Sequence, residues 1–486
     1  MNTQYTRYAF IITLASSAIL AATTALAADF RGPIATQGKA LITASDQARF
    51  IVRGVALASN NHNKDLLGDS EHDYFAQKIL PRLLELNVNA VRVYSVDLSQ
   101  GHDATMNLLK QNGIYALIGM ASEQVNVNRV DPNYSITLRE RITDVIDAFS
   151  GYENILGYSV GNEVVFPGNI YDYVTNIESP PECSTQRECI ERAVNLEKHD
   201  ASVIKAVIRD AKAHLQSKGL STPVGVAMQD SPEASLTPPG LIGTDVVAQY
   251  YACGIASERA DYIGLNSYRY VPGGPMSSYD GIAQEVAAFP IPVYLTESGA
   301  VGNSNNPTTR DWKIVGQNYT RSLLIDNLSG EVGYEFFNEP NNFGLYTEDA
   351  GLTETPWGGA QALGSEFAQA STMSVPMPSA NPATVDCPTN FNPVVPEPGE
   401  SIQITVKNYA DMRLKVVQNG SPLATLDDAI DGTPSVTAVR VHQSEEVFIL
   451  NPPNWDLVCN VAAGTLEDGW IVLNNVEWGN SCTTSR

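Results

Sequence analysis

The chain has 486 residues, 43% of them hydrophobic, which suits one large domain plus a smaller one and excludes a disordered or fibrous protein. Its 30 basic and 54 acidic residues give a formal net charge of −24. This excess of negative charge excludes nucleic acid and anionic membrane surfaces as favourable partners, whereas a neutral polysaccharide is compatible with it.

Residues 1–27 are predicted to be a secretory signal peptide. Arg7 supplies the positive charge, AFIITLASSAILAA is the apolar stretch, and TALA offers a small-residue cleavage site before Ala28. The alternative is a membrane anchor, but the apolar run is short and rich in Ala, Ser and Thr. The polar C-terminus gives no sign of a lipid anchor. We therefore expect a protein without a membrane anchor, a monomer that is secreted, extracellular, periplasmic or cell-wall associated.

The chain contains six cysteines, and export permits disulfides between them. Cys183 and Cys189 enclose a short loop and are the favoured local pair. Cys459 with Cys482 is a second plausible pair. The residues alone do not assign Cys253 and Cys387. No cysteine or histidine spacing indicates a zinc site, and no metal is expected.

Between residues 28 and 372, short apolar runs alternate with amphipathic stretches. The runs predict eight strands, at Phe50–Leu57, Ala90–Val96, Ile114–Met120, Asn154–Glu163, Pro223–Gln229, Ala260–Tyr268, Ile291–Gly299 and Val332–Glu339. Helical periodicity predicts helices between them, at Tyr74–Asn87, Ala104–Gly113, Ile136–Tyr152 and Ala201–Gly219. This alternation predicts an α/β fold, a (β/α)₈ TIM barrel. The rival is a doubly wound open sheet, but no G-x-G-x-x-G motif follows the first strand.

The composition changes near Met373. Residues 373–400 are rich in Pro, Ser and Asn and are predicted to be a linker. Residues 401–486 alternate apolar and polar positions between turn signals, which predicts a small all-β C-terminal module. Its tryptophans could form a sugar platform, although core packing is the better interpretation.

In a TIM barrel, catalytic residues lie where strands end at the C-terminal face. The polar and aromatic residues at the predicted strand ends are Arg92, Tyr94, Asn162, Glu163, Asn266, Tyr268, Glu297, Tyr334, Asn338 and Glu339. Two of them, Glu163 and Glu297, follow the fourth and seventh strands, which face each other across the barrel. Each alone is more often a structural residue than a catalytic one, but their joint placement is much less common by chance.

Such a pair of carboxylates is what glycoside hydrolysis needs: one protonates the leaving oxygen and the other attacks the sugar or activates water. A retaining pair lies about 5 Å apart. Asn162 is expected to donate a hydrogen bond to a sugar hydroxyl. Arg92 is expected to keep the nucleophile ionised, and Tyr268 to hydrogen-bond it.

Several stretches resemble the β-1,3-glucanosyltransferases of fungal cell walls, glycoside hydrolase family seventy-two. They include VRVYSVD, GNEV, SERADYIGLNSY, IPVYLTESG and FFNEPNNFGLY, and they run in family order from about Arg53 to Tyr346. The chain resembles a divergent member of this family, of the glucan-elongating type.

The resemblance implies a retaining enzyme in which Glu163 is the general acid/base and Glu297 the nucleophile. It also implies that the sugar subsites are lined by Tyr94, Asn162, Tyr268, Tyr334 and Tyr346. The implied partners are a β-1,3-glucan donor and a glucan acceptor, and no cofactor is required. The alternatives are an endo-β-1,3-glucanase or another retaining β-glycan hydrolase, and a non-catalytic glucan-binding wall protein.

The chain departs from the family pattern in ways that affect the acceptor site more than the catalytic pair. Thr105 stands where the family usually has a cysteine, and a family cysteine after the sixth strand is missing, so Cys253 lacks its usual partner. Ser298 replaces a tyrosine after the nucleophile, and Asn338 replaces an acidic residue. These differences bear on the balance between transfer and hydrolysis.

Overall fold

The computed structural model describes residues 30–473 except for 59–64, 128–133, 178–182, 184, 390, 392–395, 399–400 and six loops of the C-terminal module (409–413, 419–420, 427–434, 443–445, 452–455 and 463–469). The predicted signal peptide and Cys482 lie outside the described residues.

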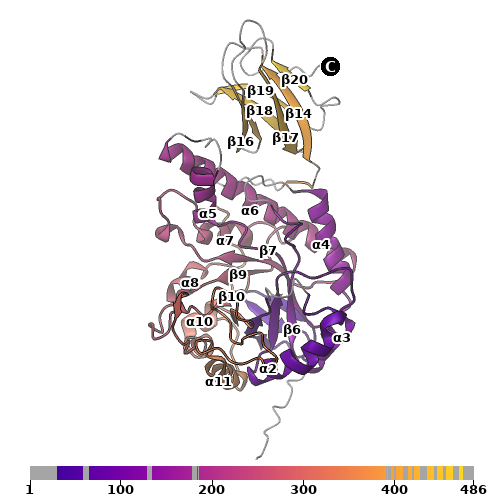
Figure 1. Cartoon of the computed structure of the whole chain (residues 1–486), viewed down its shortest axis with the longest axis vertical. Helices are drawn as coiled ribbons and strands as arrows, with labels where there is room; N and C mark the ends of the chain where they lie inside the picture. The colour runs from indigo at the N-terminus through magenta and orange to yellow at the C-terminus, as the bar shows by residue number, and fades with distance from the viewer. Residues whose placement is uncertain are drawn as a thin grey trace, which may run out of the picture.

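Within the described residues, eight parallel strands close into a barrel in chain order, with helices around them (Figure 1). The strands are β4 (Val52–Ala56), β5 (Ala90–Val93), β6 (Tyr115–Gly119), β7 (Ile155–Asn162), β8 (Val224–Gln229), β9 (Tyr262–Asn266), β10 (Val293–Ser298) and β13 (Gly330–Gly333). Pairing of β13 with β4 closes the ring, so the predicted TIM barrel is confirmed. The eighth strand ends at Gly333, earlier than expected, and residues 334–339 begin the loop that follows it.

The helices outside the barrel are α1 (His72–Tyr74), α2 (Leu80–Glu85), α3 (Asp103–Gln111), α4 (Ile136–Phe149), α5 (Pro167–Asp172), α6 (Gln186–Ser217), α7 (Thr244–Ala252), α8 (Asp280–Glu285), α9 (Gln317–Thr320), α10 (Ser322–Asn327) and α11 (Ala360–Ser371). Helix α6 begins well before the predicted Ala201. The backbone N–H of Glu188 donates to Thr185 Oγ1 at 3.2 Å, as an N-cap requires. The spacing T-x-x-E at this point was a usable start signal.

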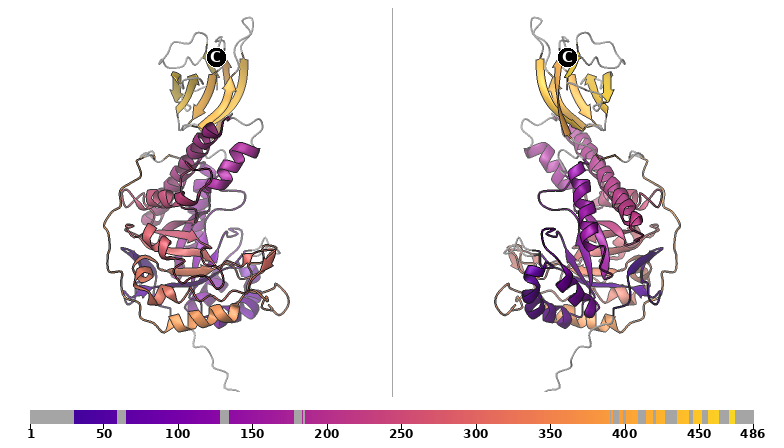
Figure 2. Two further views of the ribbon diagram at one scale, coloured as in Figure 1. Left: turned by 90° about the vertical axis from the view of Figure 1, so that its left-hand side faces the viewer. Right: turned by 90° about the vertical axis from the view of Figure 1, so that its right-hand side faces the viewer.

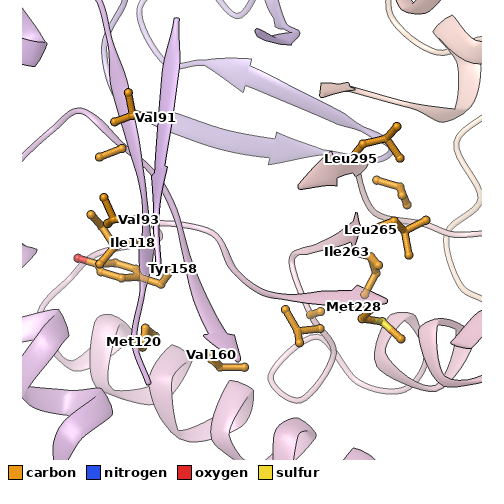
Figure 3. Packing of buried hydrophobic residues seen from close by; sticks show 14 of the residues in the cluster. Val91, Val93, Ile118, Met120, Tyr158, Val160, Met228, Ile263, Leu265 and Leu295 are labelled. Carbon is orange, nitrogen blue, oxygen red and sulfur yellow. The ribbon is translucent and has the colours of Figure 1, made fainter. Parts of the chain in front are cut away.

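Alternation along the strands separates the barrel interior from the layer between strands and helices. On β5, Val91 and Val93 lie in the outer cluster that includes helix residues such as Leu109 (Figure 3). Ala90 belongs instead to the inner cluster, with Leu117 and other residues of the barrel interior. Because successive side chains of a strand point to opposite faces, Arg92 also faces inward, toward the centre of the barrel.

A three-stranded antiparallel sheet that the sequence did not predict precedes the barrel: β1 (Ile34–Gln37), β2 (Ala40–Thr43) and β3 (Arg49–Phe50). Its Leu41 and Phe50 are buried in the inner cluster, where Phe50 packs edge-to-face on Tyr115 at 5.1 Å between ring centroids. Tyr115 begins its strand, so this contact lies at the N-terminal end of the barrel. The sheet therefore covers the end opposite the expected site with apolar side chains.

Two disulfides are present among the described cysteines. The predicted bridge between Cys183 and Cys189 is confirmed. The second joins Cys253 to Cys387, a pairing that the sequence left open, and it fastens the linker segment to the end of α7. Such bridges are typical of proteins that fold in an oxidising compartment. Among the described helices, none combines the length and the apolar character needed to cross a bilayer.

The regular elements that the structure describes in the C-terminal module are all strands, as predicted, and they lie beside the end of the molecule that carries α6 (Figures 1 and 2). Its described strands form two sheets, ordered β17-β14-β20 and β16-β15-β18-β19. They are β14 (Ser401–Asn408), β15 (Leu414–Gln418), β16 (Ser421–Leu426), β17 (Ser435–His442), β18 (Glu446–Asn451), β19 (Asp456–Ala462) and β20 (Trp470–Leu473). Arg209 of α6 forms an ion pair with Glu397 just before the module.

Candidate active site

Glu297 lies on β10 with its side chain almost fully buried at the centre of the barrel mouth. Its Oε1 accepts hydrogen bonds from Arg92 Nη1 at 2.9 Å and from Tyr94 Oη at 2.8 Å. Its Oε2 accepts a third, from Tyr268 Oη at 2.8 Å. Three donors, one of them a buried cation, therefore hold both oxygens of this carboxylate in place. Arg92 and Tyr268 touch Glu297, and the role of Glu297 as the nucleophile stays a prediction.

Arg92 organises the residues around Glu297. Its Nη1 also donates to the backbone oxygen of Thr296 at 2.8 Å and to Asn266 Oδ1 at 3.3 Å. Its Nη2 donates to Asn162 Oδ1 at 2.7 Å. The guanidinium is 2% exposed, so these contacts replace its hydration almost completely. One cation thus fixes the orientation of side chains from three strands.

Tyr94 and Tyr268 remain proton donors toward Glu297. Burial raises the pKa of both phenols well above the usual range, and the negative charge of Glu297 acts in the same direction. Tyr94 also stacks with Arg92, whose guanidinium carbon lies 4.3 Å from the ring centroid. Both tyrosines therefore touch the candidate nucleophile directly, in addition to the sugar-lining role expected for them.

Asn162 and Glu163 mark the end of β7. Glu163 has a φ of 51°, a left-handed conformation that ends the extended strand and turns the side chain of Glu163 away from the alternation before it. Its backbone N–H donates to the oxygen of Ala227 on β8 at 2.9 Å. The side-chain oxygen Oδ1 of Asn162 accepts a hydrogen bond from Arg92. The side-chain nitrogen Nδ2 of Asn162 is therefore the group that can donate to a sugar hydroxyl.

Asn266, at the end of β9, links the two carboxylates. Its Nδ2 donates to Glu163 Oε1 at 2.8 Å and to Asn162 Oδ1 at 3.0 Å. Its Oδ1 accepts from Arg92, which holds Glu297, and from Thr296 Oγ1 at 2.8 Å. The sequence placed Asn266 at a strand end but gave it no role. In the structure, Asn266 pairs with Glu297 across the neighbouring strands β9 and β10. Its place at a strand end was the only sign of a role in the sequence.

Tyr334 lies beyond the eighth strand, in a group of aromatic rings beside Tyr268. The ring centroids of these two tyrosines are 6.2 Å apart, and Phe343 lies 5.3 Å from Tyr268 and 5.6 Å from Tyr334. Phe343 was not predicted as a site residue, although it lies in the quoted stretch FFNEPNNFGLY. The three rings provide an apolar wall next to the candidate nucleophile, suited to the C–H faces of sugars.

Glu335 is a buried carboxyl that the sequence analysis missed. Its Oε1 accepts a hydrogen bond from Asn341 Nδ2 at 3.1 Å, and the same nitrogen donates to Tyr334 Oη at 3.3 Å. Burial, and next the negative charge of Glu339, raise the pKa of Glu335 to about 8. Glu335 is therefore largely protonated at neutral pH, which limits the negative charge near Glu297.

Tyr346 is placed apart from the residues around Glu297. Its ring packs on Phe336 at 5.0 Å and lies beneath the guanidinium of Arg82, 5.5 Å from the ring centroid. It lines a cavity of about 340 Å³ between α2 and α11, with Glu85 and Gly364. The chain folds back after Asn338, whose N–H donates to the oxygen of Tyr346. The returning chain forms a parallel bridge between Phe337 and Tyr346 and brings Phe343 next to Tyr268.

A cleft of about 830 Å³ opens beside Glu297, over the ends of β5, β6 and β7. Its lining includes Arg92, Tyr94 and Asn162, together with Gln124 and Asn126 from the loop after β6. Glu123 also lines the cleft, so charged and neutral hydrogen-bonding groups lie beside an aromatic ring, a combination that suits a polyhydroxyl chain. The cleft thus leads toward the candidate nucleophile.

The model of the family described as glucanosyltransferase, glycoside hydrolase family 72, matches residues 23–179 and 186–359. Protein EPD1 of Candida maltosa is 29% identical over 379 residues, which is 76% of this chain and 61% of that protein. The 1,3-beta-glucanosyltransferase gel1 of Aspergillus fumigatus is 27% identical over 80% of this chain and 79% of its own. This chain spans less than two thirds of the length of EPD1.

Among solved structures, a mutant of Saccharomyces cerevisiae Gas2p in complex with laminaritetraose and laminaripentaose matches with a TM-score of 0.58 and 25% identity. The match covers 74% of this chain and 72% of Gas2p. A second Gas2p structure, with laminaritriose and laminaritetraose, has a TM-score of 0.60 at 24% identity, covers 76% of this chain and 77% of that chain, and shows the shared fold.

Proposed function

The chain belongs to the glucanosyltransferase family, and we propose that it is a retaining β-1,3-glucanosyltransferase that cleaves one glucan chain and transfers the fragment to another. One observation carries the proposal. Glu297 is held by Arg92, Tyr94 and Tyr268, and Asn266 connects this group to a second carboxylate, Glu163. The names of the relatives and the laminari-oligosaccharides bound to Gas2p support β-1,3-glucan as the substrate.

In the first step, an oxygen of Glu297 attacks the anomeric carbon and the glycosidic C–O bond breaks. Glu163 gives its proton to the leaving oxygen, so the departing chain carries a neutral hydroxyl. Asn162 donates a hydrogen bond to the hydroxyl beside the reacting carbon. As the negative charge leaves Glu297, its contacts with Arg92 and both tyrosines weaken, and they re-form when the carboxylate is released.

In the second step, Glu163 acts as a base. It removes the proton of an incoming sugar hydroxyl, whose oxygen attacks the anomeric carbon while the ester bond to Glu297 breaks. Transfer dominates over hydrolysis when an acceptor sugar is held near the glycosyl-enzyme and excludes water. The apolar wall of Tyr268, Tyr334 and Phe343 is the part of the site that we assign to holding the acceptor.

The proposal extends to the place of action. We propose that residues 1–27 direct export and that the mature enzyme acts outside the cell, on wall glucan. The two disulfides are compatible with this compartment. We also propose the boundaries 28–372 for the catalytic domain, 373–400 for the linker and 401–486 for the module.

A time course with a reduced β-1,3-gluco-oligosaccharide of defined length tests the function. Products longer than the substrate are expected, because only transfer lengthens a chain. Products that are all shorter would make the enzyme a hydrolase that uses the same two carboxylates. No reaction with β-1,3-glucan or with other β-glycans would favour a glucan-binding protein instead.

A further inference from the structure

The residues on either side of Tyr268 are fastened to one carboxylate, that of Asp230. Ser267 Oγ donates to Asp230 Oδ2 at 2.6 Å. Arg269 donates twice, from Nε to Oδ2 at 2.7 Å and from Nη2 to Oδ1 at 2.6 Å. Asp230 directly follows β8, the fifth strand of the barrel, and its side chain is 6% exposed. This buried carboxylate therefore holds the residue before Tyr268 and the residue after it.

The direction of these contacts matters for Glu297. The backbone N–H of Ser267 donates to the backbone oxygen of Glu297 at 2.8 Å. The hydroxyl of Tyr268 donates to the side-chain Oε2 of Glu297. A phenol at the end of a rigid ring reaches the carboxylate only if its backbone is correctly placed. The two-point contact of Arg269 with Asp230 fixes the direction as well as the position of this segment.

We propose that Asp230 is a positioning residue for catalysis, which acts on the nucleophile through Tyr268. Asp230 does not touch Glu297. It fixes the backbone at residues 267–269 so that the Tyr268 hydroxyl meets Glu297 Oε2 at hydrogen-bond distance. The inference rests on the proposed function. It assigns a role in that reaction to Asp230, which is not one of the two candidate catalytic carboxylates.

The chain offers a matched control. Arg321 also donates twice to one carboxylate, to Asp280, from Nη1 at 2.6 Å and from Nη2 at 2.7 Å. This pair joins α8 to the start of α10, in the helical layer. Asp280→Asn removes an ion pair in which none of residues 267–269 takes part. It therefore measures the general cost of losing such a contact.

The test is a double-mutant cycle on the full chain, with a reduced β-1,3-gluco-oligosaccharide as the substrate. Asp230→Asn is expected to lower kcat about 10- to 100-fold with KM within about threefold of wild type, because small misplacements of a reacting group are costly. In a Tyr268→Phe background, Asp230→Asn is expected to cost less than about threefold, because the hydroxyl that it positions is already absent. Asp280→Asn is expected to leave kcat within about twofold.

Equal losses from Asp230→Asn with and without the Tyr268 hydroxyl would overturn the proposal, and so would equal losses from Asp230→Asn and Asp280→Asn. If Asp230→Asn does not fold, Arg269→Gln enters the same cycle, because it breaks the same contact from the partly exposed side, together with the contacts of Arg269 to Glu285. A wild-type protein without any turnover would overturn the proposed function as well. If the wild-type protein turns over substrate but the effects of Asp230→Asn and Tyr268→Phe simply add, the role of Asp230 is overturned and the proposed function stands.

Discussion

The two candidate catalytic carboxylates lie in contrasting surroundings. Glu297 is 6% exposed, lies on β10 where the strand pairing shifts register, and accepts hydrogen bonds from a buried arginine and two tyrosines. Glu163 is partly exposed, follows the end of its strand, and has a left-handed backbone conformation. The first is held through both of its oxygens by three donors, whereas the second is partly open to solvent.

This difference corresponds to two different tasks. A nucleophile must stay ionised and approach one carbon from one direction, which rigid donors ensure. An acid/base must carry a proton in one step and lack it in the next, so it needs contact with the leaving oxygen and with the acceptor. The environment of each carboxylate, rather than its residue type, separates the roles.

Replacing the nucleophile gives the largest expected effect. Glu297→Gln is expected to lower kcat about 10⁵-fold or more, because no other described group can form the glycosyl-enzyme at that carbon. Glucan binding is expected to persist, since the cleft is unchanged. Single-turnover kinetics and oligosaccharide titration measure the two properties. Full activity in this variant would contradict the role of Glu297.

Glu163→Gln is expected to lower kcat on natural glucan about 10²- to 10⁴-fold, as for loss of a general acid. The difference from Glu297→Gln appears with a donor whose leaving group needs no proton. With such a donor, the first step of Glu163→Gln is expected to recover, while that of Glu297→Gln does not. Equal recovery in both variants would mean that the roles are not separated as described.

Asn266→Ala removes the connection between the two carboxylates. We expect about a 10²-fold loss in kcat, because Glu163 and Asn162 lose a shared donor and Arg92 loses an acceptor. Asn154→Ala is the matched control. Asn154 is equally buried and bonds two backbone oxygens, but it lies at the opposite end of the barrel. Both variants should lose stability, and only Asn266→Ala should lose most of its kcat at constant KM.

Glu335 gives a pH-dependent effect on stability. Its pKa in the folded protein is about 8, above its ordinary value of 4.5, so the folded state binds this proton more tightly than the unfolded state. The stability that this provides is complete below pH 4.5 and is lost as the pH rises through 8. Glu335→Gln cannot ionise, so its Tm relative to wild type is expected to rise between pH 4.5 and 8, by at least about 2 °C. A constant difference in Tm across this range would contradict the shifted pKa.

Removing the C-terminal module is expected to have the smallest effect. Ending the chain after Pro398 keeps the disulfide between Cys253 and Cys387 and leaves the barrel mouth intact. We expect kcat on soluble oligosaccharides to stay within about twofold, with a modest loss of binding to insoluble glucan. A pull-down with insoluble β-1,3-glucan measures this. Unchanged binding would favour a packing role for the module.

The barrel and the placement of its two candidate carboxylates could be predicted because both depend on short-range patterns. Strand periodicity located the eight strands, and residues at strand ends share one face of a barrel. Arg92, Asn162, Glu163, Tyr268 and Glu297 could therefore be brought together without coordinates. In the structure, Arg92 and Tyr268 contact Glu297, as strand alternation and the positions of the strand ends predict.

What the sequence did not predict depends on tertiary contacts or on loops. Phe343 lies beside Tyr268 because the loop after β13 folds back on itself, which no strand or helix period encodes. The raised pKa of Glu335 results from burial that only the folded loop produces. The bond of Cys253 to Cys387 joins segments 134 residues apart, and six cysteines allow fifteen pairings.

Trapping the covalent intermediate would settle whether Glu297 is the nucleophile. Glu163→Gln, given a β-1,3-gluco-oligosaccharyl fluoride, should release fluoride and then stall, because it lacks the base for the second step. Peptide mass spectrometry is expected to find the glycosyl group on the peptide that contains Glu297. A glycosyl group on another residue, or fluoride release without any covalent adduct, would contradict the retaining mechanism built on Glu297.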